Sequence, residues 1–564
     1  MRLTGRFEGY NFAKFRKDLV SGVIVGIIAI PLGMAFAIAS GVKPEYGLYT
    51  TIVAGILISL FGGSKFQIGG PTGAFIPILF AIVMQYGYEN LLIAGFMAGI
   101  ILILMGLFKM GSLIKFIPRP VTIGFTAGIA VIIFSGQIGN FLGLTDMQRH
   151  EYFLMNMKEI FMHLSSINIY SVITAVVSLT VILLTPRFLP KVPGALLGLI
   201  ISAGLAALLF NGKVATIGSA FGAIPNTLPA LQFPDLSFER ILMLIVPALM
   251  IAMLGGIESL LSAVVADRMS GSQHNSNREL IGQGIANVVT PLFGGIPATG
   301  AIARTAANIN HGAASPMSGV IHGVVVLLIL MMFAPFASHI PLASMAPILM
   351  VVAWNMSERK EFMNVLKTKS SDAAVLVLTF LLTVLTNLTI AVPAGIVLSI
   401  LVFIKRMSDS MHIVKAQPEF QFVHEIASSE SDPVAFPQLS IYTVEGPLFF
   451  GSATTFEKKV MDIIYTKPKV LLLRMGRVPV MDTTGEASFS RVVKHCLDSG
   501  GIILIAGIQQ QPLQVIKRSG LYDIIQSEHI FERTGEAINY ALRLNDQKHE
   551  YKLSLGKAVN QILH

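Results

Sequence analysis

Two stretches rich in glycine and proline decide how this chain folds. GGPTGAF occupies residues 69–75, and GGIPATGAIART, at residues 294–305, repeats its Gly-Gly, Pro and Thr-Gly-Ala elements in the same order. The two stretches lie 227 residues apart when Thr72 is matched to Thr299. Because glycine and proline interrupt helices, a motif that recurs in this way indicates a non-helical backbone feature that is present twice in the fold.

The composition shows which solvent surrounds the chain. Of its 564 residues, 53% are hydrophobic and 13% are charged, and the mean hydropathy is +0.69. A soluble protein of this length is far less apolar, so the sequence predicts an integral protein of the lipid bilayer. The lysines and arginines flank the apolar runs singly or in pairs, as topology determinants do, and we therefore expect no nucleic-acid partner.

Fourteen apolar runs precede residue 406. A helix needs roughly 20 apolar residues to cross the hydrocarbon core of a bilayer. The third and tenth runs are too short or too interrupted for a full span, and they open with the two repeated stretches. They hold the same ordinal place in two halves of seven, which predicts an internal repeat. The runs fall at residues 19–40, 46–61, 72–86, 90–108, 119–139, 168–185, 194–210, 241–263, 279–293, 298–309, 317–334, 341–355, 371–388 and 390–404.

The basic residues predict the orientation. If the amino terminus is cytoplasmic, most lysines and arginines of residues 1–406 lie at cytoplasmic ends or loops, as the positive-inside rule requires. Both termini are then cytoplasmic, and because seven is odd, the second half enters the membrane in the opposite sense. The first apolar run is not followed by a small-residue cleavage site, so we expect no cleaved signal peptide.

The residues after Arg406 have the composition of a soluble domain. The net charge changes from +10 over residues 1–406 to −1 over residues 407–564. We expect two short strands in PQLSIYTVEGPLFFGSA, buried strands at KVLLLRM and GIILIAGI, and helices over residues 455–465, 485–498 and 512–519. The expected divisions are a transmembrane domain (1–406), a linker (407–435), a small α/β domain (436–545) and a C-terminal tail (546–564).

The repeated stretches predict a binding site at the middle of the membrane. Non-helical backbone is tolerated at membrane depth only where protein buries it or where it lines a watery cavity. Gly-Gly-Pro before a Thr-Gly-Ala helix start therefore predicts an extended segment that leads into a half-helix. Two such half-helices from opposite sides would point their amino ends, each worth about half a positive charge, into one cavity. Free N–H groups there would bind an anion.

Two ionisable residues fall deep within predicted spans. Ionised side chains at that depth cost about 2.5–3.5 kcal/mol or more and normally face a cavity or each other. Glu258 and Arg304 are therefore expected either to line the site or to form a purely structural ion pair. Glu258 could carry a proton into the site with the anion, and a sodium ion held by Glu258 is the alternative.

An enzyme is not expected. The sequence contains no nucleophile motif, phosphate loop or metal-ligand spacing, so we expect no metal and no cofactor beyond the coupling ion. Cys496 is the only cysteine, which excludes an intrachain disulfide and a thiolate metal cluster. We expect it to be a small buried residue in a reducing compartment.

Further motifs resemble one transporter family. PEYGLYT at residues 44–50, the helix that contains Pro31, LGGIESLLSAVVAD at residues 254–267 and HNSNRELIGQG at residues 274–284 are similar to sequences of the SulP sulfate permease-like anion transporters, as are the paired stretches. The resemblance implies a polytopic α-helical membrane protein with fourteen transmembrane segments in a seven-plus-seven inverted repeat, divided into a core and a gate. It also implies elevator-like movement of the core, a homodimer and a cytoplasmic STAS domain.

The resemblance also implies the site residues. Leu32 stands where many members have glutamine, so the resemblance does not carry sulfate specificity to this chain. Glu258 is the residue implied for proton coupling. The substrate-binding residues implied by the family pattern are Phe36, Thr72, Gly73, Ala74, Phe75, Glu258, Thr299, Gly300, Ala301, Ala303 and Arg304.

The expected α/β domain contains a second recognisable motif. MDTTG at residues 481–485 resembles the helix-start motif of STAS domains. Asp482 and Thr483 are expected to cap that helix, and Thr484 falls on the position that is phosphorylated in anti-sigma antagonist relatives. A cap without phosphorylation is the alternative interpretation. The family also implies a cytosolic protein partner for this domain.

The sequence therefore predicts a secondary active transporter of small anions, and the resemblance implies a substrate of the sulfate, bicarbonate or C4-dicarboxylate class. Proton-coupled symport is the first hypothesis, and an anion exchanger or a sodium-coupled bicarbonate importer is the alternative. A membrane-anchored STAS signalling protein is the alternative from a different class. A nucleobase permease shares the repeat plan but lacks the tail. The compact tail resembles bacterial members, so we expect the inner membrane of a bacterium.

Overall fold

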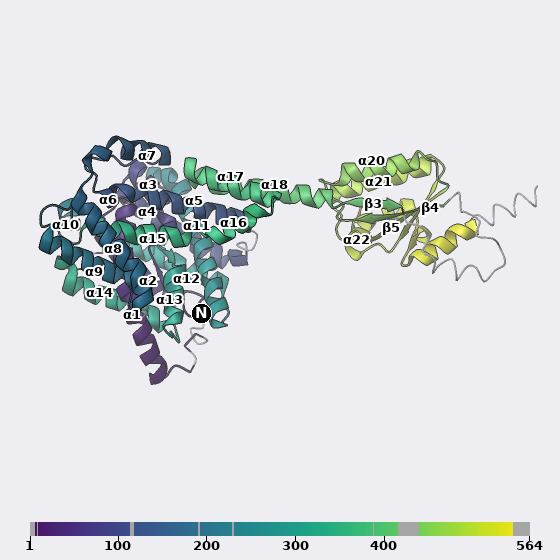
Figure 1. Ribbon diagram of the computed structural model, residues 1–564. Coiled ribbons are helices and arrows are strands. Elements are labelled where there is room, and N and C mark those ends of the chain that lie inside the picture. The colour runs from purple at the N-terminus through teal and green to yellow at the C-terminus, as the bar shows by residue number, and fades with distance from the viewer. Residues whose placement is uncertain are drawn as a thin grey trace, which may run out of the picture. The chain divides into compact units, whose positions relative to one another are not determined.

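The structure is a computed structural model, and its described residues form two compact units. The description covers residues 6–7, 9–112, 118–189, 192–227, 231–386, 388–415 and 439–544, without the side chains of residues 388–390 and 392. The units are Met1–Ser399 and Ile400–His564 (Figure 1). Each unit is described by itself below.

The first unit is helical. Among the described residues, fourteen segments correspond to the predicted runs, and seven helices are long and apolar enough to cross a membrane alone. The fourteen-segment prediction is confirmed. The segments are α1 (Phe12–Ala39), α2 (Pro44–Phe61), η1 with α3 (Gly73–Phe75 and Ile76–Tyr86), α4 (Tyr88–Leu107), α5 (Arg119–Gly136), α8 (Ile169–Phe188), α9 (Gly194–Leu209), α11 (Phe238–Ser270), α12 (Ser276–Val289), α13 (Ile302–Asn310), α14 (Met317–Ala337), α15 (Leu342–Met356), α17 (Ser371–Leu385) and α18 (Leu388–Asp409).

Shorter helices connect these segments. Two of them, α7 and α16, have one apolar and one polar face, as helices at a membrane surface do. The connecting helices are α6 (Ile138–Leu142), α7 (Phe153–Met162), η3 (Leu164–Ser166), α10 (Ile217–Phe221), η4 (Thr290–Phe293) and α16 (Arg359–Lys367).

The packing repeats between the two halves. Helix α1 packs against α14 and, with the halves exchanged, α11 packs against α4. Likewise, α2 packs against α14, and its counterpart α12 packs against α4. The pair of α5 and α17 has its counterpart in the pair of α15 and α8. Each of these three contacts has its counterpart when the first segment is matched to the eighth, the second to the ninth and so on. The structure thus confirms the repeat.

Small residues make the equivalent helix crossings close. A methyl group on Gly99 of α4 would lie 2.6 Å from the backbone nitrogen of Val288 in α12. A methyl group on Gly323 of α14 would lie 3.0 Å from the backbone oxygen of Ile52 in α2. Helices in membranes associate through such close approach, because burial of apolar surface gives little gain in lipid.

Thirteen of the fourteen segments, all except α18, form two groups. Helices α1 to α4 and α11 to α14 pack extensively on one another, and we call them the core. Helices α5, α8, α9, α15 and α17 pack on one another, and we call them the gate. Fewer contacts join the groups, chiefly α1 with α9 and α15, and α3 with α5.

The second unit is a sheet covered by helices on both faces. Side chains alternate along the central strands: Leu471 and Leu473 pack with residues of helices α20 to α23, whereas Leu472 packs with residues of the helix 534–544. The sheet order is β3 (His412–Lys415), β4 (Leu439–Glu445), β5 (Val470–Arg477), β6 (Ile502–Ala506) and β7 (Ile530–Phe531); the β3–β4 pair is antiparallel and the others are parallel. The helices are α20 (Ala453–Ile464), α21 (Thr483–Asp498), α22 (Gln510–Arg518) and α23 (Leu521–Ile525).

Two sequence predictions for this unit are wrong. The second strand expected in PQLSIYTVEGPLFFGSA does not form: Leu448 makes a single bridge to Met481, and α20 begins at Ala453. Four residues expected in the linker, His412–Lys415, instead form an edge strand on β4. A mostly exposed run of four residues has too little apolar periodicity to be distinguished from a linker. Residues 407–409 of the expected linker continue α18, and residues 416–435 lie outside the described residues.

Cys496 is buried in α21, and its burial predicts low reactivity. Desolvation raises the pKa of the Cys496 thiol to about 11. Because the thiolate is the nucleophile, about one thiol in a thousand is reactive at pH 8. We expect alkylation by iodoacetamide at pH 8 to be at least about 100-fold slower than for a free cysteine, and to accelerate as the pH rises. Rapid labelling of the folded protein at pH 8 would contradict this burial.

Candidate functional site

The two repeated stretches meet in the first unit. Strand β1 (Gly69–Gly70) pairs antiparallel with β2 (Thr299–Gly300), with Gly69 opposite Gly300 and Gly70 opposite Thr299. Beyond the strands, the backbone nitrogen of Ala301 donates to the oxygen of Ile68 at 2.8 Å. The two stretches of the chain therefore run in opposite directions. Their short ladder pairs backbone N–H and C=O groups, which must not stay unpaired within a membrane.

A helix begins directly after each strand. Thr72 is the N-cap of η1, which continues into α3, and Ala301 is the N-cap of α13. Neither residue uses its side chain to cap its helix. The first N–H groups of a helix have no intrahelical partner, and they carry the positive end of its dipole. Two uncapped amino ends thus emerge from one two-stranded ladder, as an anion site requires.

Glu258 lies at one of these amino ends. The Thr72 hydroxyl donates to Glu258 Oε2 at 2.9 Å, so the threonine that could cap η1 binds the carboxylate instead. Thr72 is buried, whereas Glu258, on α11, is half-buried. The carboxylate is therefore fixed beside η1 and retains access to the space in front of it.

Arg304 contacts the turn that follows strand β1. Its Nη2 donates to the backbone oxygen of Pro71, and its side chain is buried, with no partner for Nη1 among the described residues. Within the described residues, no ion pair of 4.0 Å or less joins Arg304 to Glu258. Of the two arrangements that the sequence left open, a direct pair does not form. The guanidinium instead holds the turn between β1 and η1.

Two aromatic side chains form walls near η1. The Phe75 ring packs against α11, where a methyl group on Gly255 would lie 3.1 Å from Phe75 Cζ. A methyl group on Gly73 would lie 3.6 Å from Phe36 Cε1 of α1. Both aromatic side chains are buried. The structure thus brings Phe36 to the amino end of η1, where the family resemblance places it.

The remaining predicted site residues lie on β2 and α13. The Thr299 hydroxyl donates to the oxygen of Gly255 at 2.9 Å, which ties β2 to α11. Gly300 and Ala301 are buried, whereas Ala303 is exposed. In this arrangement the structure brings together Phe36, Thr72, Gly73, Ala74, Phe75, Glu258, Thr299, Gly300, Ala301 and Arg304, and it places Ala303 as the second, exposed residue of α13. Their roles in binding stay predictions.

Thr484 belongs to the second unit. Asp482 caps α21 by accepting from the backbone nitrogen of Gly485 at 2.7 Å, and its second oxygen accepts from Phe450 at 3.0 Å. Thr484 is the second residue of α21, and it is exposed. Its phosphorylation stays a prediction.

Sequence reasoning missed a carboxylate that binds the segment connecting α2 to β1. Glu279 of α12 is fully buried and accepts from the backbone nitrogens of Gly63 at 2.7 Å and Ser64 at 3.0 Å, and from the Gln283 amide at 2.8 Å. Residues 63–64 connect α2 to β1. The signal was present in HNSNRELIGQG, but a glutamate in the first turn of a helix usually faces solvent.

Removing this carboxylate should destabilise the core. Glu279→Ala leaves two buried N–H groups and one amide without partners, each costing about 1–3 kcal/mol. We expect thermal unfolding in detergent at a clearly lower temperature and a parallel loss of transport. Glu89→Ala, an exposed acidic residue in the first turn of α4, is the control. Equal melting temperatures for the two variants would show that Glu279 does not hold this connection.

The fold and the site together define a membrane transporter built from an inverted repeat. The sequence pattern of the sulfate permease family matches residues 15–379, and that of the STAS domain matches residues 431–537. The chain belongs to the sulfate permease family of anion transporters.

Relatives support this assignment over the whole chain. The chain is 56% identical to the "Putative sulfate transporter YvdB" of Bacillus subtilis, an alignment that covers 95% of this chain and 99% of that protein. It is 28% identical to the "Bicarbonate transporter BicA" of a Picosynechococcus species, with 96% and 97% covered.

Two solved structures share the fold. SLC26A9 superposes with a TM-score of 0.83 at 18% identity, covering 96% of this chain and 92% of that chain. The transmembrane domain of a cyanobacterial BicA superposes with a TM-score of 0.61 at 28% identity, covering 69% and 98%. Both are helical membrane transporters, and the first likeness concerns the fold alone.

Proposed function

We propose that this protein is a proton-coupled symporter of a small anion and that Glu258 carries the coupled proton. The observation that supports this proposal is the hydrogen bond between Thr72 and Glu258 at the uncapped amino end of η1. It places the one half-buried carboxylate of this site beside the N–H groups that would receive the anion.

The coupling follows from charge. An ionised Glu258 adjoins an anion held at η1, and like charges a few ångströms apart repel strongly where water is scarce. A proton on Glu258 removes that repulsion, so anion and proton occupy the site together. Because Arg304 is engaged with Pro71, it does not neutralise Glu258 by direct contact. Proton and anion would therefore be bound and released as a pair.

The substrate class follows from the donors. The two amino ends offer backbone N–H groups, which suit the oxygens of small oxyanions. Sulfate and bicarbonate appear in the names of the relatives YvdB and BicA. We assign the substrate to the class of sulfate, bicarbonate and C4-dicarboxylates.

The transport step would move the site as a unit. The proposed binding groups all belong to the core, on its helices or on the β1–β2 ladder, whereas α5 and α15 of the gate face them from outside the core. We infer that the core slides against the gate in the manner of an elevator, within a homodimer in the inner membrane of a bacterium, with both termini cytoplasmic. The STAS domain then faces its cytosolic protein partner.

Uptake into liposomes tests the proposal. Purified protein would be given radiolabelled sulfate, bicarbonate, succinate, fumarate and aspartate, with an inward proton gradient, an inward sodium gradient or neither. We expect one of these anions to accumulate with the proton gradient alone. Accumulation with sodium alone would replace proton symport by sodium coupling, and uptake that requires only an anion inside would identify an exchanger. No uptake of any anion would favour the signalling alternative.

A further inference from the structure

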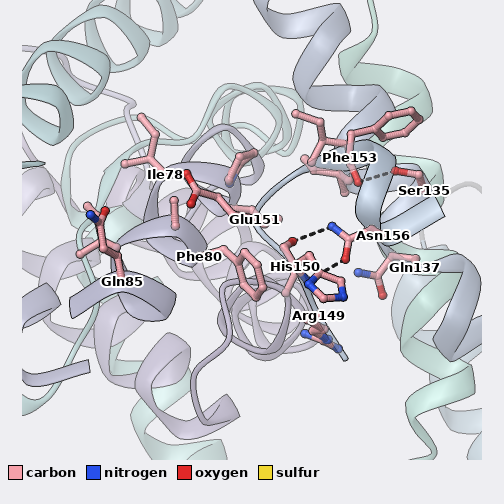
Figure 2. Close-up of a pocket in the computed structure, with 18 of the residues that line it drawn as sticks. Ile78, Phe80, Gln85, Ser135, Gln137, Arg149, His150, Glu151, Phe153 and Asn156 are labelled. Atoms are coloured by element: carbon pink, nitrogen blue, oxygen red, sulfur yellow. Dashed lines mark hydrogen bonds between the residues drawn. The ribbon is translucent and has the colours of Figure 1, made fainter. Parts of the chain in front are cut away.

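The two ends of helix α5 differ in how the polar groups around them are bound. Near the last residues of α5, Figure 2 shows Arg149, His150 and Asn156 beside a cavity. Arg149 donates to the oxygen of Ile38 at 3.0 Å, and the Asn156 amide bonds the backbone of His150 in both directions. These groups therefore have partners within the protein.

At the other end, where α5 begins, helix α16 carries basic side chains that no carboxylate pairs. Residues 354–369, from the end of α15 through α16, contain four basic and two acidic residues. One of the acids, Glu361, pairs instead with Arg119 of α5 at 2.5 Å. Within the described ranges, none of the four basic side chains lies within 4.0 Å of a carboxylate. They are Arg359, Lys360, Lys367 and Lys369, and all four are exposed.

Basic and apolar side chains share one stripe of α16. Its members are spaced at i, i+4, i+7 and i+8, as residues on one helix face are, and all are exposed: Arg359, Met363, Leu366 and Lys367. The adjoining face packs inward, because the Phe362 ring lies edge-on to a phenylalanine of α17 with 5.4 Å between centroids. Helices that lie in a membrane surface carry such mixed stripes, with apolar groups in the lipid and basic groups at the headgroups.

The only tryptophan of the chain lies beside this stripe. Trp354, near the end of α15, is 54% exposed, and the Arg359 guanidinium carbon lies 3.8 Å from the centroid of its ring. Tryptophan is enriched at the boundary between lipid and water. A guanidinium that stacks by its face keeps its N–H edge for phosphate oxygens. The pair thus combines a lipid anchor with a phosphate donor.

We propose that this surface, formed by Trp354, Arg359, Met363, Leu366 and Lys367, binds the headgroup of an anionic phospholipid. The basic side chains complement the charge of the phosphate. The exposed apolar side chains favour a lipid over a soluble anion, because only the lipid has acyl chains beside its phosphate. Helix α16 packs on α5 and α17, so the lipid would hold the gate at the membrane surface. That consequence rests on the proposed transport function, whereas the lipid site does not.

Quenching of fluorescence tests the site, because Trp354 is the only tryptophan. The full chain is placed in vesicles with equal amounts of phosphatidylglycerol and phosphatidylcholine. Bromine atoms, which quench tryptophan only at close range, are carried on the acyl chains of one lipid or of the other. The composition is then constant, and only the labelled lipid changes. We expect brominated phosphatidylglycerol to quench at least about twofold more than brominated phosphatidylcholine.

Paired variants test whether the preference belongs to α16. With Arg359→Gln and Lys367→Gln together, we expect the two brominated lipids to quench equally. Each variant is compared with itself in vesicles without bromine, because Arg359 also touches the fluorescent ring. Arg187→Gln with Arg268→Gln removes two exposed basic residues from the last turns of α8 and α11, and this matched control should keep the natural preference.

Three outcomes would overturn the site. Equal quenching by the two lipids in the natural protein would show no preference for an anionic headgroup. Quenching by neither lipid would show that protein covers Trp354. A natural preference that persists in Arg359→Gln with Lys367→Gln would place the headgroup elsewhere. The comparison in the natural protein needs no variant and no substrate, so it decides the site even if no tested anion is transported.

Uptake tests the consequence for the gate. Replacing phosphatidylglycerol by phosphatidylcholine should slow anion uptake by the natural protein at least about threefold, because the headgroup that holds α16 is then missing. The Arg359→Gln, Lys367→Gln variant should be slow in both kinds of vesicle. Uptake by the natural protein that does not depend on phosphatidylglycerol, with the quenching preference intact, would show that the bound lipid does not support the gate.

Discussion

We expect Glu258→Gln to abolish proton-driven accumulation of the anion while leaving exchange in place. Glutamine keeps the size of the side chain and an oxygen that can accept from Thr72, but it cannot release a proton. A gradient of one pH unit supplies about 1.4 kcal/mol per proton, enough for about tenfold accumulation of an anion carried with one proton. The expected result is therefore a fall from about tenfold accumulation to none. Counterflow of labelled against unlabelled anion should persist.

The measurement is a liposome uptake series at a fixed membrane potential. Equal potassium on both sides with valinomycin holds the potential at zero, so the proton gradient alone drives accumulation. Glu239→Gln, an exposed glutamate in the first turn of the same helix, controls for loss of an acidic residue from α11. If Glu258→Gln accumulates the anion as Glu239→Gln does, Glu258 does not carry the proton and coupling lies elsewhere.

Gly70→Ala should nearly abolish transport for two independent reasons. Gly70 has a φ of +147°, a backbone conformation that costs other residues about 1–3 kcal/mol. Its added methyl group would also lie 2.6 Å from Arg304 Nη1, so the buried guanidinium must leave its place beside Pro71. The strain alone corresponds to about a 5- to 150-fold loss in the population of the correct geometry.

Initial uptake rates and melting temperatures check this prediction together. We expect at least about a tenfold lower rate for Gly70→Ala, because η1 then no longer sits in register with α13. Gly204→Ala is the matched control, since nothing lies within 4 Å of the methyl group that it adds to α9. A Gly70→Ala protein that transports at the rate of Gly204→Ala would show that the ladder does not position the site.

The sequence predicted the architecture because membranes restrict the choices. Apolar runs of the right length, the repeated stretch and its equivalent place in two halves were enough to predict fourteen segments and an inverted repeat. The soluble tail was harder to predict. The edge strand His412–Lys415 pairs with β4 through backbone groups. Its four mostly exposed residues have no side-chain pattern that predicts a strand.

Within the site, local patterns located the groups but not their partners. The sequence placed Glu258 and Arg304 at membrane depth, yet it left open whether they pair. Tertiary structure decided that Glu258 accepts from Thr72 and that Arg304 donates to Pro71, because these partners come from another half of the chain. Such contacts depend on where β1 and β2 cross.

By itself, the sequence determined that two half-helices begin at membrane depth, since Gly-Gly-Pro and Thr-Gly-Ala break and restart a helix wherever they occur. Only the tertiary structure decided what surrounds their amino ends. Ile133 of α5 and Met356 of α15 are ordinary apolar residues in ordinary apolar helices, and no pattern distinguishes them. Their nearest atoms lie 3.5 Å and 3.4 Å from a methyl group placed on Gly73, because the gate packs against the core there. That packing depends on helices distant in sequence and on no local signal.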